Sequence, residues 1–268
     1  MLYLSQGKEE ERHVGWDPSQ YLKFADLRLR PAIDLLNRID ISDPERVYDL
    51  GAGTGNVTQL LKLRWPKARI TGVDSSEEML AKARKSLPDI AWQRADLESW
   101  RPPERAEVIY SNAALHWIGN HEHLFPALLS AVAPGGVLAV QMPNNFSSPS
   151  HTVIATAVRS GPWQRTLEPF LRPVPVAEPA FYFGVLASHA AKIDIWETEY
   201  LQVLEGEHPI KEWTKGTWLK PLLDALDEPD RSRFESSYAD LLAAAYPRRP
   251  DGRTLFPFRR LFIVASAK

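Results

Sequence analysis

The first half of the chain alternates between short apolar runs and amphipathic stretches. Five runs have the length of a buried strand. They span residues 47–50, 69–73, 90–94, 108–111 and 137–141. A helical face that includes Leu60 and Leu61 follows the first run, and a helix over 29–39 precedes it. Strands that alternate with helices predict a parallel, doubly wound α/β sheet.

Local signals mark where the helices and turns of this pattern begin and end. Trp65-Pro66 is predicted to end the helix after the first strand, because proline disfavours helical backbone in the residue before it. Ser75, followed by Glu78, forms a capping-box signature that opens the next helix, with Met79 facing inward. Pro134-Gly135-Gly136 predicts a turn before the fifth strand.

The second half is less regular and predicts insertions into the sheet. Residues 143–184 are rich in proline and show little sustained periodicity. The stretch 193–204 is long and β-like, and 261–265 is apolar, so both indicate that the sheet resumes. Between them, residues 209–246 have an amphipathic helical pattern.

Composition excludes several classes of protein. The 268 residues include 32 Lys+Arg and 34 Asp+Glu, so a net charge of −2 gives no reason to expect nucleic acid as a partner. The chain has no cysteine, which excludes disulfides and thiolate metal sites and is typical of a reducing cytoplasm. There is no signal-peptide pattern and no apolar run of membrane-spanning length, so we expect a cytoplasmic protein without membrane contact.

The candidate chemistry begins at a glycine loop. The segment 49–55 reads Asp-Leu-Gly-Ala-Gly-Thr-Gly at the end of the first strand, where glycine permits positive φ and close approach of a ligand to the backbone. A dinucleotide fingerprint requires its third glycine at position 56, and this chain has Asn56 there. Asp74 lies 23 residues after Gly51, at the end of the second strand, where a carboxylate can accept both hydroxyls of a ribose.

A second acidic residue indicates the base of the same ligand. Asp96 follows the third strand, where its carboxylate can accept from an adenine amino group while Leu97 packs on the ring. An unphosphorylated nucleoside is therefore favoured. Two structural alternatives stay open: Gly55 may serve helix packing alone, and Asp49 may be only a turn residue.

These residues, together with Ser111-Asn112-Ala113 and Pro134-Gly135-Gly136, resemble the motifs of class I S-adenosylmethionine-dependent methyltransferases. The resemblance implies a Rossmann-like seven-stranded sheet and S-adenosyl-L-methionine as cofactor. It also implies that the loop contacts the methionine moiety and that Asn112 lines the methyl group. The residues expected to bind the cofactor are Trp16, Arg30, Asp49, Gly51, Gly53, Asp74, Ser75, Met79, Asp96, Leu97 and Asn112.

The same resemblance predicts the organisation of the chain. Residues 1–268 form one methyltransferase domain, with a cofactor-binding core over 30–145. The segments 146–190 and 205–255 are expected to form helical insertions, a cap around the acceptor site.

The flanks of the motifs are similar to a narrower group, the trans-aconitate 2-methyltransferases. The similarity rests on Trp16-Asp17-Pro18, Arg28-x-Arg30-Pro31, Ala113-x-Leu115-x-Trp117 and Phe256-Pro257-x-Arg259-Arg260. It implies transfer of methyl to one carboxylate of a small tricarboxylic acid, trans-aconitate, giving a monomethyl ester. The alternative is a class I methyltransferase that acts on another small-molecule acid or on a hydroxyl acceptor.

A carboxylate acceptor changes which residues the site must contain. With a pKa near ~4 it is ionised at pH 7, so attack on the methyl group needs positioning and no general base. A polycarboxylate also needs cations, and guanidinium groups bind carboxylates in a fork. Arg259 and Arg260 are adjacent on a strand, so at most one of them can enter the site, and either can instead form a surface ion pair. The expected substrate-binding residues are Tyr21, Arg28, Trp117, Arg259 and Arg260, and the expected positioning residues are Tyr21, His116 and Trp117.

Alternatives remain for several of these aromatic and polar residues. Trp16 and Tyr21 may only anchor an N-terminal helix, Trp117 may be a core residue, and one of the arginines may hold the cofactor carboxylate. His121-Glu122-His123, in a polar loop, matches no standard zinc spacing, so no metal is predicted.

Three other functions share part of the pattern. They are an NAD-dependent oxidoreductase, a binding module that senses S-adenosylmethionine, and a methyltransferase that acts on nucleic acid or protein. Asn56 and Asp96 count against the first, and the near-neutral charge counts against nucleic acid. The chain is expected to act as a monomer on a small-molecule polycarboxylate.

Overall fold

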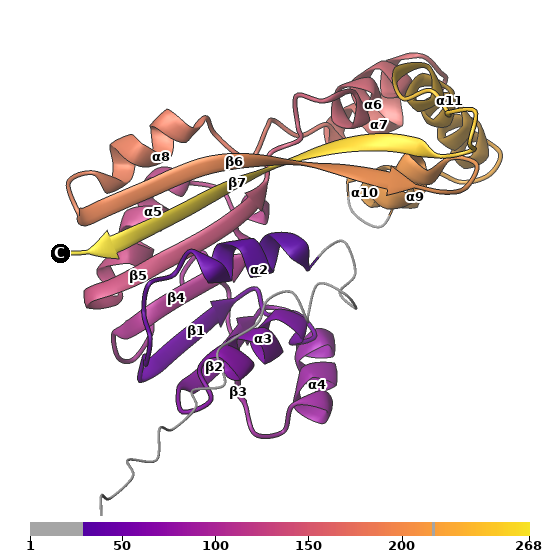
Figure 1. Ribbon diagram of the computed structural model, residues 1–268. Helices are drawn as coiled ribbons and strands as arrows, with labels where there is room; N and C mark the ends of the chain where they lie inside the picture. The colour runs from indigo at the N-terminus through magenta and orange to yellow at the C-terminus, as the bar shows by residue number, and fades with distance from the viewer. Residues whose placement is uncertain (1–28, 216–217) are drawn as a thin grey trace, which may run out of the picture.

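A computed structural model of the protein describes residues 29–215 and 218–268. The predicted site residues Trp16, Tyr21 and Arg28 lie outside the described residues. The described chain contains a seven-stranded sheet with the order β3-β2-β1-β4-β5-β7-β6 (Figure 1). The strands are β1 (Arg46–Leu50), β2 (Arg69–Asp74), β3 (Ala91–Arg94), β4 (Ala106–Asn112), β5 (Val132–Pro143), β6 (Ala190–Leu204) and β7 (Thr254–Ala267).

The strand directions confirm the predicted Rossmann-like class I methyltransferase sheet. Strands β1 to β5 pair in parallel, whereas β7 is antiparallel to both β5 and β6. The order reverses between β1 and β4, so the loops after these strands diverge and leave a crevice at their carboxyl ends. The residues that follow β1, β2 and β4 therefore meet at one edge of the sheet.

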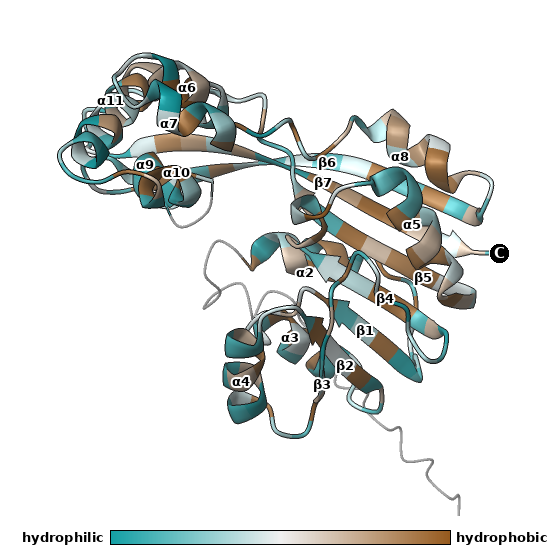
Figure 2. Cartoon of the chain, turned by 180° about the vertical axis from the view of Figure 1, so that it is seen from behind, coloured by the Kyte–Doolittle hydropathy of each residue, from teal (hydrophilic) through white to brown (hydrophobic). Residues whose placement is uncertain are grey.

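Helices cover both faces of the sheet. On one face α2 (Arg30–Asn37) and α3 (Asn56–Arg64) pack in a core with the apolar side chains of β1, β4 and β5. On the other face α5 (His121–Ser130) and α8 (Pro179–Leu186) share a second core with β5 and β7. Helix α4 (Glu77–Ser86) lies beside β2 and β3, and Figure 2 shows its surface as mainly hydrophilic. A sheet buried on both faces explains why its strands read as continuous apolar runs.

A separate group of helices, here called the helical module, is carried on the far ends of β6 and β7 (Figure 1). Its helices are α6 (Pro149–Arg159), α7 (Gln164–Leu167), α9 (Pro209–Lys215), α10 (Lys220–Asp224) and α11 (Asp230–Ala245), with the 3₁₀ turn η2 (Glu168–Phe170). They enclose a third core that includes Phe234, Tyr238 and Phe256. The segment predicted as one insertion, 146–190, is thus divided, since α6 and α7 join the module and α8 returns to the sheet.

The structure corrects several local predictions. Helix α4 is capped by Ser76 instead of Ser75, because Ser76 Oγ is the atom that accepts from the Met79 N–H, at 3.3 Å. Met79 was predicted to face inward and is instead 46% exposed. Residues 121–123, interpreted as a polar loop, form the first turn of α5. These residues are helical because they belong to α5, whose apolar face, including the fully buried Phe125, packs in the core.

The helix predicted to stop at Trp65-Pro66 does so, with α3 ending at Arg64.

Within the described residues no helix is long and apolar enough to cross a membrane.

Candidate active site

The loop after β1 has a backbone that requires glycine. Gly51, Gly53 and Gly55 have φ values of 76°, 56° and 87°. A side chain at Gly51 would collide with Ala114, which follows β4, so the two loops touch. A side chain at Gly55 would come within 2.7 Å of the Trp92 ring, which supports helix packing as the role of this glycine. The neighbouring residues Ala114 and Trp92 therefore leave no room for a side chain at Gly51 or Gly55.

Asp74 joins the ends of β1 and β2. Its Oδ2 accepts from the Gly53 N–H and its Oδ1 from the Ser76 N–H, both at 2.8 Å. Each carboxylate oxygen can accept at least one more hydrogen bond, so the group can hold the glycine loop and still bind two ribose hydroxyls. The predicted neighbour Ser75 is exposed on the outer side of this turn.

Asp96 and Leu97 lie just beyond β3, as the sequence predicts. The Asp96 carboxylate is exposed and accepts from the Glu98 N–H at 3.0 Å. Leu97 is 8% exposed and belongs to the sheet core, with its side chain close to Gly51. An exposed acceptor next to an apolar surface is the arrangement that an adenine ring requires.

Asp49 lies behind the glycine loop. It is 2% exposed, and Thr58 Oγ1 donates to its Oδ2 at 2.6 Å. Burial raises the pKa of Asp49 to about 7, with a further contribution from the charge of Asp74. Asp49 is thus a residue of β1 and not of the turn, and its carboxyl group ties this end of the strand to α3.

A cavity of about 390 Å³ opens in front of the loop. Residues that end β1 and β4 form one side, and β7 together with the helical module forms the other. The lining residues are Leu29, Ala52, Gly53, Thr54, Asn56, Val57, Met79, Asn112, Ala113, His116, Trp117, Pro143, His151, Trp213, Thr214, Trp218, Phe258 and Arg260. Its volume is within the range of small-ligand sites.

The segment after β4 shows strain and unsatisfied polar atoms where the cavity begins. Ala113 has a φ of 54°, a conformation that costs free energy in a residue other than glycine and is frequent at functional sites. Asn112 Oδ1 is buried, and within the described chain it has no hydrogen-bond partner. Gln141, which pairs with Asn112 on β5, is fully buried. Its Oε1 and Nε2 atoms also have no hydrogen-bond partner within the described chain. Buried polar atoms of this kind are rare and favour a ligand-binding role.

Aromatic rings form the wall opposite the loop. The Trp117 and Trp218 rings stack with centroids 5.7 Å apart, and Phe146 contacts Trp218 at 5.0 Å. His116, 5% exposed, lies against Trp117 at 4.7 Å. Burial, and next the positive charge of Arg260, lower the pKa of His116 to about 3, so its imidazole is neutral near pH 7.

The predicted arginines occupy different places. Arg260 lines the cavity at 7% exposure, with its guanidinium 4.5 Å from the centroid of the Phe258 ring. Arg259 is exposed on the opposite face of β7, as the alternation of a strand requires. Arg30, at the start of α2, is also exposed and lies over the Tyr200 ring at 5.1 Å, outside the lining of the cavity. The structure thus brings one of these three guanidinium groups into the cavity.

Comparisons with known proteins agree with this geometry. Residues 47–136 match the family described as "Methyltransferase domain" (Methyltransf_25). Trans-aconitate 2-methyltransferase of Azoarcus sp. (strain BH72) is 47% identical over 250 residues, covering 93% of this chain and 98% of that protein. The enzyme of the same name from Yersinia pestis (strain Pestoides F) is 44% identical, covering 94% and 98%.

The chain belongs to the trans-aconitate 2-methyltransferase family. Membership confirms the predicted methyltransferase activity and S-adenosylmethionine as the cofactor. The YcgJ protein of Bacillus subtilis has the same fold, with a TM-score of 0.58 at 13% identity, covering 89% of this chain and 98% of that one.

Much of the wall opposite the glycine loop was not predicted from the sequence. The helical module contributes four residues to the lining of the cavity, which are His151, Trp213, Thr214 and Trp218. Their positions are far from the glycine loop in the sequence, and no local spacing connects them to it. The dense tryptophans of this region were the one available signal.

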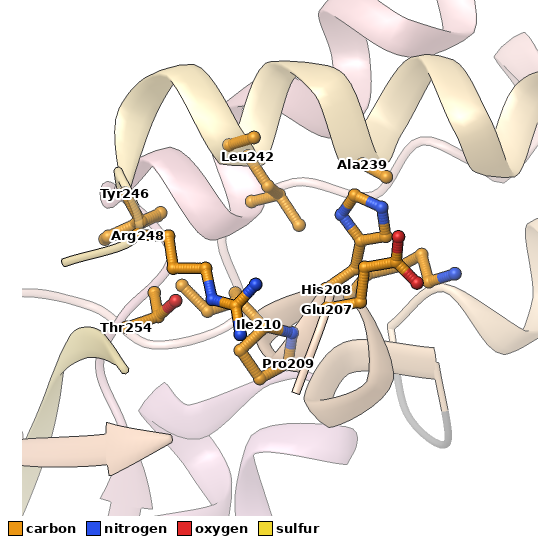
Figure 3. Close-up of a pocket in the computed structure, with 11 residues that line it drawn as sticks. Glu207, His208, Pro209, Ile210, Ala239, Leu242, Tyr246, Arg248 and Thr254 are labelled. Carbon is orange, nitrogen blue, oxygen red and sulfur yellow. The ribbon is translucent and has the colours of Figure 1, made fainter. Parts of the chain in front are cut away.

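Several other cavities lie in or beside the helical module, and two of them bear on the site. One of about 300 Å³ adjoins the main cavity, shares His151 and Trp218 with it, and is otherwise mainly apolar. Another, of about 50 Å³, lies under α11, where Leu242 points into it and Ala239 lies next to His208 (Figure 3). The latter is too small for a nucleoside.

His121, part of the rejected metal pattern, has a structural environment. Its Nδ1 lies 2.8 Å from Tyr182 Oη and its Nε2 3.0 Å from the Leu115 carbonyl oxygen. The imidazole therefore connects α5 to α8 and to the turn η1 (Leu115–Trp117).

Proposed function

We propose that this protein transfers the methyl group of S-adenosylmethionine to one carboxylate of trans-aconitate, giving a monomethyl ester. The observation that carries the proposal is the single cavity in which Gly53 and Asn112 face Arg260 and an aromatic wall. The relatives that share almost the whole length of the chain are named for this acceptor.

The cofactor is proposed to lie along the ends of β1, β2 and β4. Its methionine part contacts the loop at Gly51 and Gly53, Asp74 binds the ribose, and Asp96 with Leu97 binds the adenine. The hydrogen bonds from Gly53 and Ser76 to Asp74 support this placement, because they orient the carboxylate before the ligand arrives. Met79 lines the cavity on the cofactor side.

The acceptor is proposed to lie between the methyl group and the aromatic wall. A carboxylate is already a nucleophile at pH 7, so the wall has to exclude water and hold the attacking oxygen in line with the methyl group. Arg260 supplies a positive charge that compensates the desolvated carboxylates. Trp117 covers the acceptor, and Tyr21 and Arg28 remain predicted contacts outside the described residues.

The second candidate, a hydroxyl acceptor, would need a general base. His116 is the imidazole nearest the segment that follows Asn112, but a pKa of about 3 makes it a weak base. This observation favours a carboxylate.

The decisive experiment incubates the purified protein with labelled S-adenosylmethionine and a panel of small di- and tricarboxylates. We expect an alkali-labile methyl ester to form fastest on trans-aconitate. Exclusive labelling of an alcohol or amine in the same panel would contradict the proposal.

We further propose that the protein acts as a monomer in the cytoplasm, with segments 146–190 and 205–255 as the cap. Sedimentation velocity measures the oligomeric state.

A further inference from the structure

His151, at the start of α6, lines the acceptor side of the cavity and has no role in the function proposed above. Its ring contacts those of Phe146 and Trp218, with centroids 5.1 and 5.8 Å apart. It also lines the adjoining apolar cavity, so it lies at the boundary between the two. The aromatic contacts hold the imidazole in place where an acceptor would sit.

A chain of hydrogen bonds orients this ring from behind. The backbone N–H of Arg259 donates to Asn145 Oδ1 at 3.2 Å, and because an N–H can only donate, this bond defines the orientation of the amide. Asn145 Nδ2 then donates to Ser150 Oγ at 3.0 Å. Ser150 Oγ lies 3.0 Å from His151 Nδ1. Asn145 and Ser150 are 1% and 0% exposed, so water does not compete for these bonds.

The chain is compatible with a tautomer that leaves Nε2 for a ligand. The buried Ser150 hydroxyl accepts from Asn145 and has a proton of its own to place, and donation to His151 Nδ1 satisfies that proton. A neutral imidazole that accepts at Nδ1 carries its proton on Nε2. In this tautomer the ring offers one donor distal to Ser150.

The charges around the ring suit an anionic ligand. Burial lowers the pKa of His151 to about 4, against a smaller opposite effect of the Asn145 carbonyl, so the imidazole is neutral near pH 7. The neutral His116 ring and the cationic Arg260 lie in the same cavity. The first turn of α6, with its partial positive charge, carries His151 itself. A neutral donor beside one cation can bind a carboxylate of the acceptor. In the empty cavity, the neutral donor adds no second buried charge.

We propose that His151 accepts from Ser150 at Nδ1 and, by donating from Nε2, binds a carboxylate of the acceptor other than the one that is methylated. The reacting carboxylate has to lie near Asn112 and the methyl group. Asn112 lines the cavity from the end of β4, whereas His151 and Arg260 line it from α6 and β7. His151 then selects acceptors that carry more than one carboxylate. This inference rests on the proposed function.

The test compares three variants. His151→Phe keeps the aromatic contacts and removes both ring nitrogens, and His151→Gln restores a donor. His189→Phe is the matched control, since His189 is exposed before β6 and does not line the cavity. We expect His151→Phe to raise KM for trans-aconitate about 10- to 100-fold with cofactor Kd changed less than twofold, and His151→Gln to recover most of the loss.

A second acceptor separates binding from a merely structural role. The acceptors are dicarboxylates, each of which lacks a different carboxylate of trans-aconitate. The increase in KM caused by His151→Phe should nearly vanish for the dicarboxylate that lacks the group bound by His151. Equal penalties on every acceptor, or an unchanged KM in both variants, overturn the inference. If the unmodified protein does not methylate trans-aconitate, the proposed function fails instead, and the panel shows this before any variant is measured.

Discussion

The two walls of the cavity are built in different ways. The wall proposed to bind the cofactor, here called the cofactor wall, consists of turns that directly follow adjacent parallel strands, and backbone N–H groups of Gly53 and Ser76 hold its acidic residue, Asp74. The wall proposed to bind the acceptor, here called the acceptor wall, consists of side chains from distant segments, such as His151 and Arg260, set among aromatic rings. A cofactor that never changes suits the first construction, and an acceptor that differs between enzymes suits the second.

The cores behind the two walls are also distinct, although Trp218 packs against both of them. The cofactor wall rests on the sheet, whereas α6, α9 and α11 pack in their own core on the far ends of β6 and β7. Side chains that the helical module contributes to the acceptor wall, such as His151, can therefore change without repacking the sheet. Variants on one wall should affect one ligand, and the following predictions test this separation.

The largest effect is expected from the pair of neighbouring arginines. Arg260→Gln should raise KM for trans-aconitate by the equivalent of about 2–5 kcal/mol, because it leaves a buried carboxylate without its cation. Arg259→Gln, on the exposed face of β7, should keep a KM close to that of the unmodified protein. Steady-state kinetics measures both. Equal effects would show that the alternation along β7 does not decide which arginine binds.

On the cofactor wall, Asp74→Ala should weaken cofactor binding by about 1.5–3 kcal/mol, or roughly 10- to 150-fold, because a charge-assisted contact to the ribose is lost. KM for the acceptor at saturating cofactor should hardly change. Asp89→Ala, which removes an exposed carboxylate after α4, is the control. Calorimetry that gives the same cofactor Kd for Asp74→Ala and the control would contradict the ribose assignment.

A smaller effect is expected on stability from the carboxyl group behind the loop. The folded Asp49 has a pKa of about 7, above the ordinary value, so between pH 4 and 7 the folded protein holds a proton that the unfolded chain has lost. Stability should therefore fall as the pH rises through this range. Asp49→Asn, which keeps an acceptor for Thr58, should therefore be more stable than the unmodified protein at pH 8.

The advantage of Asp49→Asn should nearly disappear near pH 4, where the carboxyl group is protonated in the folded protein and about half protonated in the unfolded chain. Urea unfolding at pH 4, 6 and 8 measures it. A stability difference that does not depend on pH would show that Asp49 is ionised in the folded protein.

The smallest effect is expected for the pH dependence of methyl transfer. His116 and His151, with pKa values of about 3 and 4, are neutral throughout pH 6.5–8.5, and a carboxylate acceptor is ionised. The rate at saturating substrates should be flat over this range. An inflection near pH 7 that vanishes in Asp49→Asn would report the loop. One that vanishes in His116→Ala, with a ~10³-fold loss of turnover, would restore general-base chemistry.

The sheet could be predicted from the sequence, and so could the positions of Gly51 and Asp74, which are proposed to bind the cofactor. Strand and helix periodicities at 47–141 are local, and parallel pairing brings the ends of β1, β2 and β4 to one edge whatever else the chain does. Gly51 and Asp74 are therefore recognisable from their spacing. The prediction that only one of Arg259 and Arg260 enters the site also followed from local geometry, because neighbouring side chains on a strand point to opposite faces.

Which arginine enters, and what surrounds it, was decided by the tertiary structure. The inward face of β7 depends on its pairing with β5 and β6, which opposes Arg260 to Pro143. His151 and Trp218 reach the cavity only because β6 and β7 carry the helical module past the edge of the sheet (Figure 1). Likewise, the packing of α5 placed His121 in a helix where its polar neighbours indicated a loop. Local spacing carries no information about such contacts, since they form between segments that meet only after the chain has folded.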